Sequence, residues 1–337
     1  MRWQTHERYI RNTLAQKLEI PLLGKIFFAC KNNTQYAEWL TNEMDVPAEL
    51  LFYGDTAPAD ALTNMTANRN DVLLVAPGTY TGTGAAPLTW SKDVTHMIGL
   101  QKMAPAEYGG STITICTTSE SGIQAMDLSG DRCQIEGIAF ENLGENAACK
   151  AALKETGHQN YVKNCMIMGM IRSEQSQNAD CCSLWIGTAT LAAGVSSKYE
   201  GCDIGGAGGA TRTVANGQIL FGLTGSVAAG SGMTFTKCRI SGRAENVDPC
   251  MVKIVAAYCI DKMLLFDDCM FYNFRESHDS TMSAYVVRDG CNTTHDIVMK
   301  NSGQHGHTAW TNENTHCFNC SPDAADGGGE AVACDES

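Results

Sequence analysis

The residues best suited to bind a metal ion lie near the C-terminus. His305 and His307 are separated by one glycine, and His316 is followed by the pair Cys317 and Cys320. Imidazole nitrogens and thiolates are common zinc ligands, so this group is a candidate metal site. A second matched pair at the spacing of a zinc finger is missing. We therefore favour polar loop histidines and packed thiols, and we expect no metal ion or other cofactor.

The first residues of the chain indicate the compartment in which its 16 cysteines fold. Arg2, Arg8 and Arg11 are spread through residues 1–23, which contain no uninterrupted apolar run, so this segment is not a secretory signal. No stretch approaches the roughly eighteen apolar residues of a membrane span. We expect synthesis in a reducing cytoplasm, where thiols stay free unless they bind metal or do redox chemistry.

The composition is typical of a folded, soluble protein. Of the 337 residues, 44% are hydrophobic and 18% are charged, and the formal net charge is -13. This acidic excess disfavours a broad nucleic-acid-binding or membrane-binding surface, because both polyanions attract lysine and arginine. We therefore expect neither nucleic acid nor a membrane among the partners.

Several cysteines occupy one position of an internal repeat, which we call the ladder position. Three residues before it, most repeats carry a large apolar residue, as in Phe235 before Cys238. Successive ladder positions are 22 to 37 residues apart, which is typical of a solenoid with loops of variable length. We expect these residues to pack inward as small core residues with reduced thiols. The ladder residues are Leu143, Cys165, Cys202, Cys238, Cys269 and Ser302.

The residue just before each ladder position indicates a corner. The ladder residue and the apolar residue two positions later fit one strand with both side chains inward. The large residue three positions earlier has the wrong parity for that strand, so the chain must bend between them. Asparagine, glycine and aspartate tolerate the positive φ that such a bend needs, whereas Lys237 is an exception. The expected corner residues are Asn142, Asn164, Gly201, Asp268 and Asn301.

A second series of apolar segments runs in step with the first. It shows that each repeat holds at least two strands, and the region has no amphipathic helical periodicity. We therefore predict an all-β solenoid of stacked strands. The segments are Leu184–Ile186, Ile219–Phe221, Val252–Ile254 and Tyr285–Val287, with Ile186, Phe221, Ile254 and Val287 as equivalent positions.

Residues 71–80, DVLLVAPGTY, resemble the first strand of right-handed parallel β-helix proteins of the pectin-lyase-like superfamily. Segments 94–100, 113–115, 125–128 and 133–142 follow in the order of the early coils of that superfamily. The resemblance covers roughly residues 71–310. It implies a right-handed parallel β-helix with coils of about 22–37 residues and a short α-containing N-terminal cap or arm. The asparagine-rich corner is similar to the turn that carries stacked asparagines in these proteins.

The resemblance also implies that candidate catalytic residues for a polysaccharide lyase or glycoside hydrolase must be sought. Asp267 and Asp268 match the paired aspartates of the superfamily's inverting hydrolases. However, Asp268 stands at a corner position, and the companion motifs N-T-D, G-H-G and R-I-K are not found in order. The acidic residues that a calcium-dependent lyase would need are scattered over different coils. We therefore favour solvated corner residues and no catalytic residue, and keep a lyase or hydrolase as the alternative.

We expect four parts along the chain: an N-terminal arm or cap at 1–24, a pre-domain at 25–70, the parallel β-helix at 71–310 and a tail at 311–337. The tail contains glycines and three cysteines. Among these, Cys317, Cys320 and Cys334 lie outside the predicted repeat. Metal binding and cross-linking are both open to them.

Two segments resemble structural proteins of tailed bacteriophages: residues 24–28, GKIFF, and residues 75–80, VAPGTY. The resemblance implies a virion protein made in the host cytoplasm, with the major capsid protein or tail components as partners. We favour a head-associated decoration protein without catalysis, because a tailspike would carry a carboxylate cleft. A homotrimer is expected from how such helices associate in phage. The alternatives are a tailspike-like protein that binds or degrades polysaccharide and a non-catalytic carbohydrate-binding module.

Overall fold

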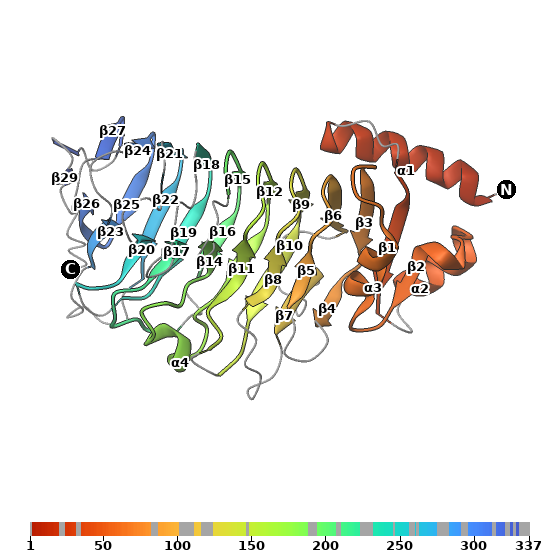
Figure 1. Ribbon diagram of the computed structural model, residues 1–337, viewed down its shortest axis with the longest axis horizontal. Helices are drawn as coiled ribbons and strands as arrows, with labels where there is room; N and C mark the ends of the chain where they lie inside the picture. Colours follow the sequence, from red (N-terminus) through yellow and green to blue (C-terminus); the bar gives the residue numbers. More distant parts are fainter. Residues whose placement is uncertain are drawn as a thin grey trace.

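Three long parallel β-sheets run along the molecule, and most coils add one strand to each sheet (Figure 1). Among the described residues, sheet A has eleven strands and sheets B and C have eight each, because three strands of sheet A have no described counterpart in the other two sheets. The predicted all-β, right-handed parallel β-helix is thereby confirmed. The computed structural model describes residues 2–19, 24–31, 35–81, 87–100, 111–115, 124–145, 148–187, 194–206, 210–222, 232–244, 247–255, 260, 263–274, 283–290, 296–311, 315–320, 324–325 and 328–329.

Sheet A extends beyond the expected start of the β-helix. Its first strands, β1 and β2, come from the expected pre-domain, and β1 pairs with both β2 and β3. In sheet order, sheet A contains β2 (Leu51–Tyr53), β1 (Ile26–Cys30), β3 (Asp71–Val75), β6 (Thr95–Gly99), β9 (Gln134–Glu136), β12 (Tyr161–Lys163), β15 (Lys198–Glu200), β18 (Met233–Thr236), β21 (Met263–Asp267), β24 (Asp296–Lys300) and β27 (Thr315–Phe318).

From β3 to β26, each strand of sheet A is followed along the chain by one strand of sheet B and one of sheet C. Sheet B contains β4 (Gly78–Thr81), β7 (Ser111–Ile115), β10 (Ile138–Asn142), β13 (Met166–Met168), β16 (Asp203–Gly205), β19 (Arg239–Gly242), β22 (Met270–Asn273) and β25 (Gly303–His305). Sheet C contains β5 (Leu88–Trp90), β8 (Gln124–Leu128), β11 (Ala151–Glu155), β14 (Leu184–Ile186), β17 (Gly217–Phe221), β20 (Cys250–Ile254), β23 (Ser283–Asp289) and β26 (His307–Thr311). A two-stranded antiparallel pair, β28 (Ala324–Ala325) and β29 (Gly328–Gly329), follows them.

The core lies inside the coils, where parallel register stacks side chains of the same kind. The rings of Tyr199 and Phe235 stack at 5.0 Å, and those of Phe235 and Phe266 stack at 4.9 Å. All three residues are fully buried. Because the strands of one sheet lie about 4.8 Å apart, equivalent residues of successive coils meet face to face.

A residue with positive φ forms the corner between sheets A and B in each of the C-terminal coils. This backbone conformation turns the chain and changes its parity, so the side chains three positions apart on either side of the bend both point inward. Lys237, the exception by residue type, adopts it as well. The φ values are 68° at Gly137, 49° at Asn164, 61° at Gly201, 53° at Lys237, 56° at Asp268, 49° at Asn301 and 52° at Asn319.

The predictions for Asn142 and Leu143 were wrong by one strand. Phe140 belongs to sheet B, where it pairs with Ile167, and so it is not the sheet A residue that precedes a corner. The register instead places Gly137 at the corner and Ile138 at the ladder position. Asn142 is buried inside β10, and Leu143 is only partly buried. At the other end, Asn319 forms one more corner and the buried Cys320 joins the ladder.

The second predicted series is correct in its first three segments. Leu184 pairs with Ile219, and Ile219 pairs with Val252. The fourth segment is shifted by two residues, because Val252 pairs with Val287 whereas Ile254 pairs with Asp289. A seven-residue strand, β23, offers more than one apolar pair for the same pattern.

Helix α1 (Arg2–Leu18) lies against the outward face of sheet A at its N-terminal end (Figure 1). The Trp3 ring packs edge-on against Phe28 at 5.9 Å, and Lys17 Nζ lies 3.2 Å from a Glu136 oxygen. The other helices are short: α2 (Gln35–Glu38), a π-helical turn Trp39–Glu43, a 3₁₀ turn Ala48–Leu50, α3 (Ala57–Asn64) and α4 (Ser173–Ser176). None of the described helices is long and apolar enough to cross a membrane.

Candidate binding surface

Charged and aromatic side chains meet on the outward face of sheet A in its middle coils. Tyr161 pairs with Lys198 across β12 and β15, and Lys163 pairs with Glu200. The Tyr161 hydroxyl donates a hydrogen bond of 2.6 Å to the Glu200 carboxylate, which also lies 2.6 Å from Lys198 Nζ. The ammonium groups of Lys198 and Lys163 lie 5.2 Å and 5.8 Å from the Tyr161 ring centre. We call these four residues the Tyr161 cluster.

Two residues of the Tyr161 cluster, Glu200 and Tyr161, keep their protonation states near neutral pH. Hydrogen bonds from Lys198 and Tyr161 lower the pKa of Glu200, so its carboxylate stays ionised. Burial and the neighbouring Glu200 raise the pKa of Tyr161, so the phenol stays protonated. A general acid or base needs a pKa near the working pH. The cluster is therefore suited to hydrogen bonding and charge recognition, and unsuited to proton transfer near neutral pH.

Neighbouring carboxylates of sheets A and B also have cationic partners. Lys17 reaches Glu136, and Arg239 forms a two-pronged salt bridge with Asp203. These ion pairs connect adjacent coils or join helix α1 to the sheet. The Glu136 and Asp203 carboxylates are buried, whereas the side chains of Lys17 and Arg239 are exposed, so solvent screens each pair in part.

The two candidate catalytic aspartates occupy different places at one corner. Asp267 ends β21, lies 3.4 Å from Lys300 Nζ and accepts a hydrogen bond of 3.2 Å from the Asn301 side chain. Asp268 is the exposed corner residue with positive φ. Neither lines either of the two pockets described below. The geometry matches solvated corner residues.

The candidate histidine ligands lie on three different sheets. His305 in β25 stacks on Tyr272 with 4.6 Å between ring centres. His307 in β26 is fully buried, and burial and the Arg212 charge lower its pKa to about 3. His316 in β27 lies 3.4 Å from Asp296. This separation argues against the candidate metal site.

The two candidate cysteine ligands, in contrast, share one corner. Cys317 stands three positions before Cys320, and their side chains are in hydrogen-bonding contact. Over the described ranges, no three His, Cys, Asp or Glu side chains gather as a metal-binding set. Cys334 lies outside the described residues.

An apolar groove of about 260 Å³ separates helix α1 from the outward face of sheet A. Ile10 and Leu14 form the helical wall, and Phe28, Leu74 and Ile98 form the floor. Exposed aromatic rings lie at its rim on Tyr9 and Trp39, which are 73% and 48% exposed. The groove has few polar groups, so it is suited to an apolar side chain and not to a polar substrate.

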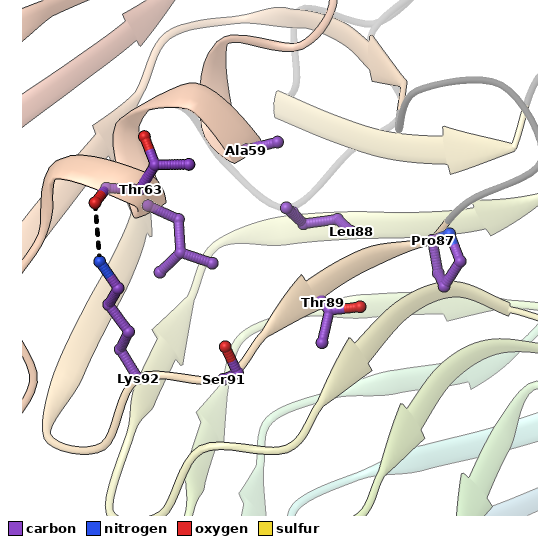
Figure 2. Close-up of a pocket in the computed structure, with 8 residues that line it drawn as sticks. Ala59, Thr63, Pro87, Leu88, Thr89, Ser91 and Lys92 are labelled. Carbon is purple, nitrogen blue, oxygen red and sulfur yellow. Dashed lines mark hydrogen bonds between the residues drawn. The ribbon is translucent and has the colours of Figure 1, made fainter.

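A second pocket, of about 240 Å³, lies between α3 and β5 (Figure 2). Leu62 and Leu88 line it, together with Thr89 and Lys92. The Lys92 ammonium donates to the Thr63 carbonyl oxygen at 2.9 Å, as Figure 2 shows, and also to a second carbonyl of the same helix end. Because this cation caps a helix C-terminus, the pocket has no free charged group to orient a ligand.

A carboxyl group buried inside the solenoid escaped prediction from the sequence. Glu155 ends β11, and its oxygens accept hydrogen bonds from Asn160 at 2.9 Å, Ser197 at 2.6 Å and the Tyr199 hydroxyl at 2.6 Å. Burial raises the pKa of Glu155 despite these donors. The donors come from sheet A and the turn before it, so the network ties two sheets together across the core. A glutamate at the end of an amphipathic strand gives no local signal of this role.

A buried arginine was also not predicted, because no local sequence signal marks it. Arg212 is fully buried and donates to the Cys250 carbonyl oxygen at 2.8 Å and to the Arg243 carbonyl oxygen at 3.2 Å. Burial lowers the pKa of Arg212 to about 10, so it remains charged at neutral pH. Its bonds to backbone oxygens of the next coil make it a structural residue.

Comparisons with solved structures agree with this architecture. A pectin methylesterase from Aspergillus niger in deglycosylated form has a TM-score of 0.54 at 18% identity, over 83% of this chain and 89% of that chain. A carrot pectin methylesterase has a TM-score of 0.52 at 13% identity, over 83% and 82%. Pectate lyase Pel9A has a TM-score of 0.51 at 12% identity, over 84% and 63%.

No protein-family model matches the sequence, and no curated protein matches it. At identities below 20%, structural similarity establishes the fold but not the chemistry of the site, which depends on the individual residues. Three stacked parallel sheets, corners with positive φ and these structural neighbours lead to one conclusion. The chain has the right-handed parallel β-helix fold that these pectin methylesterases and this pectate lyase share.

Proposed function

We propose that this chain is a structural protein of a tailed-bacteriophage virion, associated with the head as a decoration protein and without catalytic activity. The observation that supports the proposal most is the pairing of carboxylates with lysines on the outward face of sheet A. Glu200, Glu136 and Asp267 there are each paired with a lysine. The pair of Glu136 links the sheet to α1, that of Asp267 links two coils, and Glu200 is linked to the preceding coil through the Tyr161 hydroxyl.

The resemblance of residues 24–28 and 75–80 to phage structural proteins supports the same proposal. In the structure these segments form β1 and the β3–β4 junction, the first layers of the solenoid. Partners in this role are other virion proteins, with the major capsid protein as the first candidate and tail components as the second. We further propose a homotrimer, which sedimentation of the purified protein tests directly.

Mass spectrometry of purified particles tests the virion assignment. The expected result is a stoichiometric copy number of this chain on intact particles and its presence on heads separated from tails. Its absence from washed particles contradicts the proposal, and its presence on tails alone contradicts the head location.

Polysaccharide binding is the second candidate, and the Tyr161 cluster favours it. Lys163 and Lys198 beside an aromatic ring fit an acidic sugar chain, and the structural neighbours include pectin methylesterases solved with hexasaccharides. A glycan array tests binding, with Tyr161→Ala as the variant expected to lose it. Turnover of acidic polysaccharides that is lost in Asp267→Ala or Asp268→Ala would instead establish an enzyme.

A further inference from the structure

We propose that Cys317 and Cys320 form an intrachain disulfide when the folded protein meets an oxidising medium, and that this bond clamps the last strand of sheet A. The inference concerns these two residues alone and does not depend on the virion assignment. It follows from the geometry of the corner, from the exposure of the strand and from the contrast with the other cysteines.

The corner brings two side chains together in every coil. The residue three positions before the ladder and the ladder residue both point inward across the positive-φ residue. In the coils from Cys165 to Ser302 an apolar or aromatic residue stands beside a cysteine or serine, as with Phe266 and Cys269 or Met299 and Ser302. In the last coil the register pairs Met299 with Cys317, so a cysteine takes the large residue's place. Two thiols therefore share one corner.

The two thiols are close to one another, and Cys317 is the more accessible of the two, because Cys320 is buried. Their side chains are in hydrogen-bonding contact, and the corner residue between them, Asn319, already holds the bent backbone. Cys317 is partly exposed, and its strand neighbour Phe318 is 57% exposed. A small oxidant can reach Cys317 through this partly exposed surface.

The ladder thiols also contact one another, as Cys238 does with Cys202 and Cys269, but they differ in exposure. Cys202 is 1% exposed, and its thiol lies 3.5 Å from the Val162 and Glu200 carbonyl oxygens. This burial shields the Cys202 thiol from a dissolved oxidant, whereas Cys317 is partly exposed. The ladder thiols therefore serve as an internal control for selectivity.

The reaction balances with a small-molecule disulfide such as oxidised glutathione. The Cys317 thiolate attacks one sulfur of the oxidant, which forms a mixed disulfide and releases one glutathione thiolate. The Cys320 thiolate then attacks the Cys317 sulfur and releases the second glutathione. The two protons lost by the cysteine thiols are taken up, by way of solvent, by the two glutathione thiolates, and the two electrons from the cysteines reduce the oxidant to two thiols.

The bond has a clear structural consequence. Among the described strands, β27 is the terminal strand of sheet A and pairs with β24 alone. A terminal strand opens more readily than an internal one. A disulfide across Asn319 fixes the corner in its bent form, so the amides of 315–320 are held against β24.

Peptide mapping tests the proposal. The native protein is equilibrated with oxidised glutathione, free thiols are blocked, and the unfolded chain is cut with chymotrypsin, which cleaves after Phe318 between the two cysteines. The expected result is loss of two of the 16 titratable thiols and one species joining the Cys317 and Cys320 peptides, separated by reductant. Hydrogen exchange of 315–320 is expected to slow on oxidation of the wild type.

Three variants make the test specific. Cys317→Ser and Cys320→Ser are each expected to abolish the linked species and the change in hydrogen exchange. Cys334→Ser is expected to preserve both, because it shares the chymotryptic peptide of Cys320 but not the corner. No linked species in the wild type, or a link that requires Cys334 or a ladder cysteine, overturns the proposal.

Discussion

The side-chain amide of Asn319 donates a hydrogen bond of 2.9 Å to the side-chain oxygen of Asn301, the equivalent corner residue one coil earlier. The Asn301 amide in turn donates to Asp267 at 3.2 Å. Corner residues thus stack between coils as the strands do. Their positive φ values explain why polar, turn-forming residues recur just before an inward-facing cysteine.

Lys237 is the corner residue for which glycine should be better. Its φ of 53° strains a side-chain-bearing residue, and glycine removes that strain. We expect Lys237→Gly to raise the free energy of unfolding by about 0.5–1 kcal/mol. Thr236→Gly, in the adjacent strand, is the matched control and should lower it by a similar amount. Urea unfolding measures both, and destabilisation by Lys237→Gly would contradict the corner assignment.

The four ladder cysteines should remain reduced in the folded protein. Cys165, Cys202, Cys238 and Cys269 are at most 2% exposed, and their thiols contact backbone carbonyl oxygens. Alkylation of the native protein should therefore leave all four unmodified, and alkylation after unfolding should label all four. Mass mapping reads the result. A disulfide between any two of them would disprove the inward ladder.

Glu155 should make stability depend on pH. Its pKa is raised in the folded state above the ordinary 4.5, so folding favours the protonated form. Its stabilising contribution is complete below pH 4.5 and is lost as the pH rises through the raised value. Glu155→Gln should therefore flatten the fall of the melting temperature above pH 4.5.

Glu200→Gln is the matched control for Glu155→Gln. The pKa of Glu200 is lowered in the folded state, so its contribution is present above pH 4.5 and is lost as the pH falls through the lowered value. The control should remove stability on the neutral side. Melting curves at several pH values separate the two, and identical pH profiles for both variants would count against the buried Glu155 network.

The aromatic stack should dominate the stability of the middle coils. Phe235 contacts rings on both sides at 5.0 Å and 4.9 Å and is fully buried. We expect Phe235→Ala to lower the free energy of unfolding by about 3–5 kcal/mol. Phe318→Ala, at an exposed site, should change it by less than about 0.5 kcal/mol. Equal effects of the two substitutions in guanidinium unfolding would refute the stack's role.

The repeat was readable from the sequence because Phe235–Cys238 and Phe266–Cys269 each combine strand parity with a turn residue. The same pattern failed at Phe140–Leu143, where a sheet B strand happens to place an asparagine and an apolar residue at the same spacing. Cys320 was missed as a ladder member because its coil is short. Glu155 could not be predicted, because its partners Ser197 and Tyr199 come from the next coil.

The proposed surface could be predicted only in part. Asp267 and Asp268 were recognised as a possible pair, and the corner position of Asp268 already argued against catalysis. The Tyr161 cluster had no sequence signal, since Tyr161 and Glu200 lie 39 positions apart and meet through parallel register. Side chains that meet through the stacking of coils can be predicted only when the strand register is known. The register depends on the loop lengths, which the composition does not determine.

A cryo-electron microscopy map of the assembled particle tests the central claim most directly, because it shows location, attachment and symmetry together. The account predicts elongated density that fits the stacked coils on the surface of the head, grouped in threes. Particles whose heads carry no such density, or a map that places the β-helix on the tail alone, would contradict it.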